Sequence, residues 1–342
     1  MKFSVGYQLH EEGEEPFADV LRDYREHVAE VYFPWGDTAS GRASIATRRG
    51  YIDWTALPRM EAELLKFREM GLKLDLLFNA NCHGGKGISI ELRNQVGSIL
   101  DHLHERVGGV DVVTTTSLFI ARMIKDHYPQ IEVRASVNMR LGQVQAMEDV
   151  ADWFDSYYLQ RDYNRDLPHL REVKEWAVSR KKGLHILANS GCLRFCAAQT
   201  FHDNLVAHDA EVDERQNVPG YVPHLCWNLM KKQSHWKRLV QATWIRPEDV
   251  RRYEGLVDGL KLATRMHARP RLVLQAYTSG KYHGNLLDLF EPSLTKSLGG
   301  HALDNDAFPD DWFERTSTCG GACHRCDYCG RVLQKVLVRP GE

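Results

Sequence analysis

The stretch that decides the fold is GLHILAN (Gly183–Asn189), a mostly apolar run that ends in a polar amide before the turn residues Ser190 and Gly191. Runs of the same character recur along the chain. Short, continuous apolar runs are typical of parallel strands that are buried on both faces of a sheet. They predict eight strands: Phe3–Gln8, Ala29–Phe33, Leu72–Asn79, Val110–Thr115, Ile131–Val137, Ser156–Leu159, Gly183–Asn189 and Gly259–Ala263.

Longer stretches between these runs place apolar residues at helical spacing and charged residues on the opposite face. They predict helices at Ala56–Met70, Ile88–His104, Leu118–His127 and Leu170–Ser179. Alternating strands and helices indicate βαβ units. Eight strands favour a closed TIM-type (β/α)8 barrel over an open sheet, and 342 residues suffice for one such barrel with a tail.

Two segments interrupt the alternation. Residues 192–241 form a long insertion rich in histidine and aromatic residues, and long insertions in compact barrels are usually functional. The end of the chain combines Gly299–Gly300, the acidic stretch Asp304–Asp311 and a cysteine-rich run. We predict a barrel domain of residues 1–290, including the insertion 192–241, and a Cys-rich C-terminal appendage of residues 291–342.

The composition is that of a globular protein, with 43% hydrophobic and 26% charged residues. A formal net charge of −2 argues against general nucleic-acid binding. The N-terminus does not read as a signal peptide, and no apolar run reaches the ~18–20 residues of a membrane span. We therefore expect a cytoplasmic protein, in which eight cysteines would not form a disulfide framework.

The strongest local motif is TCGGACHRCDYCG (Thr318–Gly330), in which four cysteines follow the spacing C-x3-C-x2-C-x2-C. Such a compact run resembles ferredoxin runs, where cysteine thiolates hold iron–sulfur clusters. A structural zinc knuckle is the alternative, although zinc usually takes two well-separated cysteine pairs. The spacing CxxxCxxC of radical S-adenosylmethionine enzymes is also present, but far from the first strand. The predicted metal ligands of the tail are Cys319, Cys323, Cys326 and Cys329.

A second group of cysteines belongs to the barrel. Cys192 comes just after the strand Gly183–Asn189, at the catalytic face of a barrel. If the turn opens a helix, Cys192 and Cys196 share one face, and the helix N-terminus favours their thiolate forms. Cys226 in the insertion is the third predicted ligand. Cys82 follows the strand Leu72–Asn79 and is a further cofactor-binding candidate, the alternative being an inert buried thiol.

The candidate catalytic residues are His202, His208, Arg161 and Arg265. A lone histidine is more often structural, and His202 and His208, six residues apart, do not share a helix face well. Arginines near several strand ends would together suit a carboxylate or phosphate ligand at the mouth. The alternative is that they are helix caps and surface ion pairs; besides the two above, they include Arg134, Arg165 and Arg246.

The order of several motifs resembles the collagenase-like (U32) peptidase family, which includes YegQ-type proteins and the ubiquinone-biosynthesis proteins UbiU and UbiV. The resemblance covers most of residues 1–282. The motifs are VAEVYFPWG (Val28–Gly36), VVTTTSL (Val112–Leu118), LQRDYNRDL (Leu159–Leu167), LANSGCLRFC (Leu187–Cys196) with His202, and WIRPED (Trp244–Asp249) followed by YEGLVDGLKLATR (Tyr253–Arg265).

This resemblance implies a TIM-type barrel that binds a 4Fe–4S cluster through four cysteines. For several members it implies oxygen-independent hydroxylation of ubiquinone precursors or RNA. The chain departs from the family pattern in two ways. Its central region offers three cysteines and needs a fourth ligand, from Cys82 or the tail, and the C-terminal run is an addition that would hold a second cluster.

The leading hypothesis is an iron–sulfur oxidoreductase that hydroxylates or otherwise modifies a small molecule or biomolecule at the barrel mouth. It would carry one or two 4Fe–4S clusters, with zinc in the tail as the alternative. One alternative function is a metal-dependent hydrolase or peptidase, although no HExxH motif is present. Another is a non-catalytic electron-transfer or scaffold partner. The expected partners are the substrate and an electron-donor protein or heterodimer partner.

Overall fold

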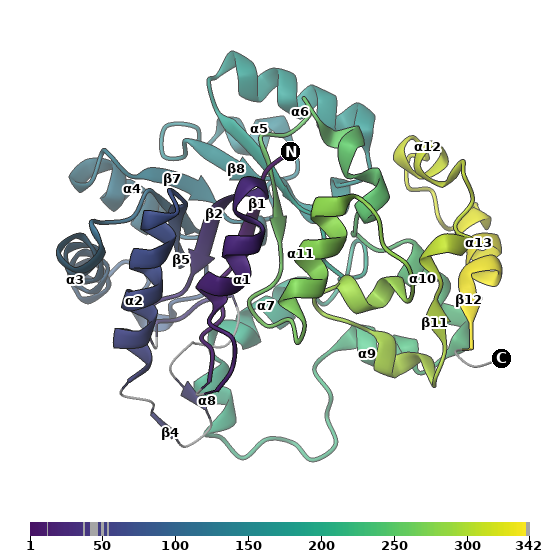
Figure 1. Ribbon diagram of the computed structural model, residues 1–342, viewed down its shortest axis with the longest axis horizontal. Helices are drawn as coiled ribbons and strands as arrows, with labels where there is room; N and C mark the ends of the chain where they lie inside the picture. Colours follow the sequence, from purple (N-terminus) through teal and green to yellow (C-terminus); the bar gives the residue numbers. More distant parts are fainter. Residues whose placement is uncertain (12, 37, 42–46, 49–50, 53–54, 340–342) are drawn as a thin grey trace.

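The computed structural model describes residues 1–11, 13–36, 38–41, 47–48, 51–52 and 55–339. Eight parallel strands close into a barrel in the order β1-β10-β9-β8-β7-β6-β5-β2, with helices around it (Figure 1). The predicted TIM-type barrel is confirmed, and each predicted strand overlaps one strand of the barrel. The barrel strands are β1 Phe3–Gly6, β2 Val28–Phe33, β5 Lys73–Phe78, β6 Val112–Thr115, β7 Glu132–Ala135, β8 Ser156–Tyr158, β9 Gly183–Leu187 and β10 Gly259–Leu262.

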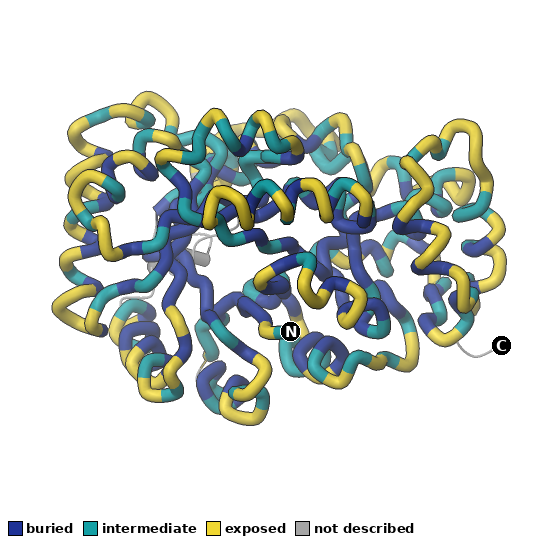
Figure 2. The backbone as a smooth tube through the Cα atoms, turned by 90° about the horizontal axis from the view of Figure 1, so that it is seen from above, coloured by how far each residue is buried: buried dark blue, intermediate teal, exposed yellow. Residues whose placement is uncertain are grey.

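Helices form the outer layer, and the tube in Figure 2 shows buried strands within a rim of exposed helical turns. Local chemistry sets their ends: the hydroxyl of Ser89 accepts the N–H of Leu92 to begin α3, and Gly108 ends it with a φ of 76°. All four predicted helices are present. The outer helices are α1 Phe17–Asp23, α2 Ala56–Glu69, α3 Ile90–Val107, α4 Leu118–His127, α5 Val144–Glu148, α6 Leu167–Ser179 and α11 Pro270–Ser279.

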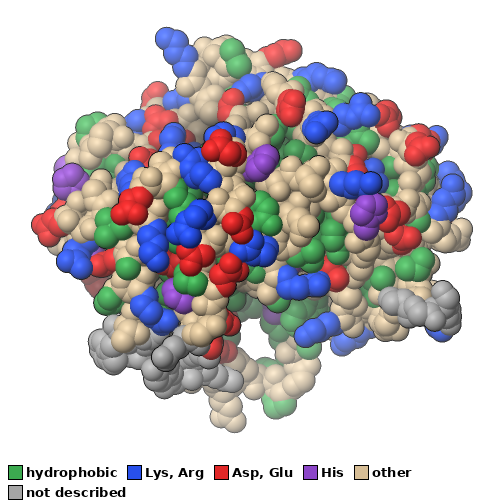
Figure 3. Space-filling model, viewed as in Figure 1, with side chains coloured by type: hydrophobic (Ala, Val, Ile, Leu, Met, Phe, Trp, Pro, Cys, Tyr) green, Lys and Arg blue, Asp and Glu red, His purple; other side chains and the backbone are tan. Residues whose placement is uncertain are grey.

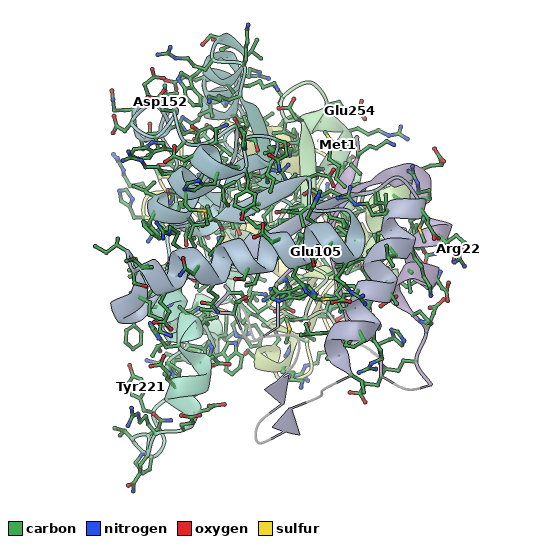
Figure 4. All side chains as sticks on the ribbon, turned by 90° about the vertical axis from the view of Figure 1, so that its left-hand side faces the viewer. Met1, Arg22, Glu105, Asp152, Tyr221 and Glu254 are labelled. Carbon is green, nitrogen blue, oxygen red and sulfur yellow. The ribbon has the colours of Figure 1, made fainter. Side chains whose placement is uncertain are left out.

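The insertion between β9 and β10 is a chain of short helices: α7 Gln199–Ala207, α8 Asp209–Asp213, α9 Leu225–Met230 and α10 Lys237–Val240. In Figure 4, Tyr221 marks the tip of the loop between α8 and α9, at the far end of the molecule from Met1 and Glu254. Because Met1 precedes the first strand, that far end carries the C-terminal ends of the strands. The insertion therefore extends beyond the catalytic mouth.

The C-terminal segment packs on the flank of the barrel beside α10, as Figure 1 shows. It contains α12 Trp312–Ser317, α13 Tyr328–Val336 and the two short strands β11 Ala302–Leu303 and β12 Leu337–Val338. Its apolar side chains, including Trp312 and Val336, belong to the same hydrophobic core as the barrel. The last residues of the predicted appendage, 340–342, lie outside the described residues.

The interior of the barrel holds a network of charged side chains. Arg134 on β7 donates to Glu30 on β2 at 2.7 Å and to Ser156 on β8 at 2.9 Å. Since β2 and β7 are not neighbours, the ion pair crosses the interior. Asp75 accepts a bond from Thr114 at 2.8 Å, and burial raises the pKa of its carboxyl group. Arg134 is thus an interior residue, and the prediction that it contributes to an anion site at the mouth is wrong.

On the face shown in Figure 3, Lys and Arg side chains are interspersed with Asp and Glu side chains. Among the helices of the described residues, none combines the length and the apolar character that crossing a bilayer requires.

Candidate metal centre and thiol site

A cavity of about 240 Å³ opens at the mouth of the barrel, beyond β9. We call it the mouth chamber. It contains three of the predicted metal ligands and one of the predicted catalytic histidines. Its lining residues are Cys192, Leu193, Cys196, Gln199, His202, Val206, Asp209, His224, Cys226, Trp227, Met266, Glu291 and Pro292.

The turn after β9 brings Cys192 to this chamber. A Cβ atom on Gly191 would lie 2.1 Å from the carbonyl oxygen of Pro292, so only glycine permits the close approach of the two segments. The Gly191 N–H donates to the Glu291 carbonyl at 3.3 Å. The predicted helix after this turn is absent: Cys192 and Cys196 lie in irregular backbone, and α7 begins only at Gln199. The two thiols therefore do not belong to the first turn of a helix.

Three thiols converge in the mouth chamber. Burial, together with the charges of Cys192 and Cys196, raises the pKa of Cys226 to about 11. Because the three side chains line one cavity, their thiolates would repel one another there. A bound cation would relieve that repulsion, and several thiolates around one cavity are the ligand set of iron–sulfur clusters. Neither Cys82 nor a tail cysteine lines the chamber, so the structure does not bring the predicted fourth thiol there.

Arg161 lies at the strand end next to β9 and contacts the sulfur of Cys192. Its Nη1 donates to the Cys192 sulfur at 3.1 Å, and its Nη2 donates to Asn138 at 3.3 Å. Burial alone would lower the pKa of Arg161, but the charges of Cys192 and Asp203 raise it above its ordinary value. The buried guanidinium is therefore in direct contact with a predicted metal ligand.

The remaining chamber residues include an aromatic pair and a predicted catalytic histidine. The rings of His202 and His224 lie 4.7 Å apart, and His224 stacks on Trp227 at 4.5 Å. The other predicted residues lie elsewhere. Arg265 contacts Ser40 at 3.4 Å and does not line the chamber.

Arg246 is also separate from the chamber, because it pairs with Asp249 at 3.1 Å at the start of a 3-10 helix. The arginines at the strand ends thus do not converge on one anion site. Arg246 instead pairs with an acidic residue at a helix start, which agrees with the alternative that these arginines form helix caps and ion pairs.

Cys82 belongs to a second constellation, which we call the thiol site. It follows β5 and accepts the Gly84 N–H at 3.3 Å. His208 hydrogen bonds its sulfur, and Nδ1 of His208 lies 3.2 Å from Oε1 of Glu211. The bonds from His208 and Gly84 lower the pKa of Cys82, while the bonds to Cys82 and Glu211 raise that of His208. The sequence analysis missed Glu211, whose i,i+3 spacing from His208 was the available signal.

The thiol site predicts an unusually reactive cysteine. In metal-free protein, iodoacetamide is expected to label Cys82 faster than Cys226 or Cys329 at neutral pH, because thiolates react and the pKa values of the latter two are raised to about 11. As the pH is lowered, the labelling rate of Cys82 should fall only when the pH reaches the lowered pKa of this thiol, because the thiolate is then protonated. His208→Ala should slow it. Timed labelling with peptide mass spectrometry measures the rates, and equal rates for the three thiols would contradict the assignment.

The four tail cysteines also come together, lining a cavity of about 80 Å³ beside α12 and α13. We call this the tail pocket. Burial raises the pKa of Cys329 to about 11, the positive charge of Arg165 opposes that rise, and the charges of Cys323, Cys319 and Cys326 add to it. Within the described part of the chain, no group of three or more His, Cys, Asp or Glu side chains is arranged to hold a single metal ion.

Comparisons with known proteins agree with the fold and with the motif resemblance. No family model matches the chain. It is 26% identical over 280 residues, 79% of each chain, to a curated relative described as the uncharacterized protease MJ1657 of Methanocaldococcus jannaschii. The solved structure of the U32 peptidase Mk0906 superimposes with a TM-score of 0.54 at 14% identity, over 76% of this chain and 91% of that one.

A glycoside hydrolase family 5 mannosidase from Rhizomucor miehei gives a TM-score of 0.40 at 10% identity, over 76% of this chain and 80% of that one, which is too distant to bear on function. The likeness to the archaeal protease over most of both chains, together with the shared barrel, confirms the resemblance that the motifs indicate. By these two comparisons the chain is similar to a curated protease over most of its length and shares its fold with a solved U32 peptidase.

Proposed function

We propose that the protein is an iron–sulfur oxidoreductase whose mouth chamber holds a cluster on Cys192, Cys196 and Cys226. Its substrate would be an oxygen-bearing small molecule or modified biomolecule, changed without molecular oxygen. The observation that carries the proposal is the convergence of three thiols on a cavity at the catalytic mouth, with a buried guanidinium bonded to one of them.

The donor set fits a cluster better than a lone ion. Thiolates are the soft ligands that iron–sulfur clusters take. Each cysteine of a cluster binds a different iron, so its ligands stand further apart than those that share one ion. The mouth chamber has a volume of about 240 Å³ and three thiols in its wall, which matches the wider spacing of cluster ligands. Among the described residues, no group is arranged to hold a single metal ion.

The chain's own residues would prepare and complete such a site. Arg161 Nη1 donates to the Cys192 sulfur and fixes its position, and a cluster would bind that sulfur as the thiolate. Three cysteines leave one position of a four-iron cluster to another donor, and His202, His224 and Asp209 line the same chamber. When bound, a cluster supplies one-electron redox chemistry and, at an iron without thiolate, a Lewis acid for a substrate oxygen.

Anaerobic metal analysis tests this proposal. The wild-type protein is expected to contain iron and sulfide in equal amounts, with about four of each per cluster and the visible absorption of thiolate-bound iron. Cys192→Ser should remove about four of each, because it deletes the ligand that Arg161 holds. The matched control is Cys82→Ser, which alters a cysteine outside the chamber and should keep the full complement.

Zinc without sulfide in the wild-type protein would overturn the redox proposal. Unchanged iron in Cys192→Ser would overturn the ligand assignment, and loss of iron in Cys82→Ser would place a fourth thiol in the cluster.

The thiol site favours a second candidate function, hydrolysis of peptide bonds, which matches the printed descriptions of the relatives. Nδ1 of His208 faces Glu211, which leaves Nε2 for the thiol of Cys82. The Cys82 sulfur would attack an acyl carbon and form a thioester, while the proton of His208 passes to the departing amine. Water would then hydrolyse the thioester and restore the thiol.

Hydrolysis of a fluorogenic peptide mixture tests this candidate. Cys82→Ala should abolish any turnover, whereas Cys192→Ser should retain it because Cys192 lies outside the thiol site. Turnover that persists in Cys82→Ala, or its absence from the wild-type protein, would exclude the thiol hydrolase without touching the cluster proposal.

A further inference from the structure

We infer that the tail pocket holds a second iron–sulfur cluster, bound by Cys319, Cys323, Cys326 and Cys329 and compensated in charge by the buried guanidinium of Arg165. This site lies on the flank of the barrel. It goes beyond the proposed function, because it would exist whether or not the mouth chamber holds a cluster.

The first argument is the way the folded chain gathers the four thiols. They lie within eleven residues, yet they are distributed over the end of α12, a tight turn and the first turn of α13. Two glycines of that turn, Gly320 and Gly321, have φ values of 63° and 68°, which let the backbone reverse around the cavity. All four cysteines line the tail pocket, together with Ala322 and Tyr328.

The second argument is a buried guanidinium that has one unused hydrogen-bond donor. Arg165 is buried, and its Nη2 donates to the carbonyl oxygens of Val240 at 3.1 Å and Ala242 at 2.6 Å. Its Nη1 has no hydrogen-bond partner among the described residues. Burial lowers the pKa of Arg165, and the largest opposing influence is the charge of Cys329. A buried cation is costly unless anions compensate it, and an anionic cluster on four thiolates would add its negative charge to that of Asp249.

The aromatic packing shows that this guanidinium is held in place. It lies 4.8 Å from the ring of Trp244 on the barrel side and 5.0 Å from the ring of Trp312 on the tail side. Trp312 also stacks with Tyr328, which lines the tail pocket and immediately precedes Cys329. The charge and the pocket therefore belong to one rigid arrangement that joins barrel and tail.

The size of the pocket favours a cluster over zinc. A cavity needs a volume of about 10–15 Å³ to hold one water molecule. The tail pocket has a volume of about 80 Å³. Four thiolates that close on one zinc ion form a compact tetrahedron with no cavity between them.

The pocket is open to solvent at one edge, because Cys319 and Cys326 are exposed while the mouth cysteines are partly covered. A cluster near the surface can exchange electrons with an external one-electron carrier, while one in the chamber can face a substrate. This difference in exposure assigns the tail cluster to electron exchange.

Anaerobic metal analysis of full-length variants tests the inference. With both sites filled, the wild-type protein should contain about eight iron and eight sulfide. Cys323→Ser with Cys326→Ser should lose half of each, and Cys192→Ser should lose the other half. Arg165→Met should keep its iron but shift the reduction midpoint of the tail cluster to a more negative potential, because reduction adds negative charge. Arg165→Lys, which retains the charge, should shift it less.

Full iron and sulfide in the double cysteine variant would overturn the inference, and so would zinc without sulfide in a Cys192→Ser background. Because Arg165→Met alters a buried side chain, circular dichroism is recorded beside the potentials to check folding. An unshifted potential in a folded Arg165→Met protein would remove Arg165 from the site. Iron that survives Cys192→Ser but not the double variant would support the tail cluster even if the mouth chamber proves empty.

Discussion

Replacement of Arg134 by methionine is expected to lower the free energy of unfolding by about 3–5 kcal/mol, the cost of leaving one partner of a buried ion pair alone. Arg134 is 2% exposed; it bonds Glu30 across the barrel interior, Ser156 on the neighbouring strand and Glu132 on its own strand. Without it, the hydrogen bond from the Ser4 hydroxyl, at 2.9 Å, remains to the Glu30 carboxylate. Urea denaturation followed by circular dichroism measures the loss.

Two further variants separate charge from packing. Arg134→Lys keeps the charge but offers fewer fixed donors, so it should lose less stability than Arg134→Met. Arg122→Met removes an exposed partner of Asp126 at 3.7 Å and should cause no measurable change. A midpoint for Arg134→Met equal to that of wild type would show that the interior network contributes nothing to stability.

Replacement of Trp312 by alanine is the second large effect that we expect, with a loss of about 3–5 kcal/mol from a truncated buried indole. Trp312 is fully buried and packs against Trp244 at 5.8 Å and Phe308 at 5.1 Å. Because it joins the tail to the barrel, the variant should expose the cysteine-rich segment to proteases. Limited proteolysis with mass spectrometry locates the cuts.

The metal content of the same variant adds an independent readout. Iron at the mouth chamber should remain in Trp312→Ala, whereas iron at the tail pocket should fall. Val178→Ala, a truncation at a side chain that is 62% exposed, is the control and should change neither stability nor cleavage. Unchanged cleavage in Trp312→Ala would mean that other contacts dock the tail.

The barrel could be predicted from sequence because each barrel strand is a short apolar run, and burial on both faces leaves that signature whatever the tertiary detail. The charged interior of the barrel could not be predicted from sequence. Asp75, Arg134 and Lys261 interrupt apolar strands, but only the strand order shows that Arg134 meets Glu30 across the barrel. The sequence pattern of one strand does not show which strand on the opposite side of the barrel its side chains contact.

The sites were predictable in part for a similar reason. The position of Cys192 follows from the end of β9, but the expected helix fails because Gly191 lies against Pro292, a contact about one hundred residues away in sequence. The spacing of His202 and His208 indicated different helix faces, and the two do go to different sites. The pairing of Cys82 with His208 depends on how the insertion folds, and no local sequence pattern predicts that fold.

The contact between the β9 turn and residues 291–292 limits how the protein can be shortened. The Glu291 N–H donates to the Asn189 carbonyl at 3.0 Å, and the Gly191 N–H donates back to the Glu291 carbonyl at 3.3 Å. A gene truncated after Phe290 would encode all eight barrel strands and yet release the turn that carries Cys192. The smallest recombinant unit that preserves the chamber therefore extends past the barrel, and a deletion of the tail is not a clean probe of the tail alone.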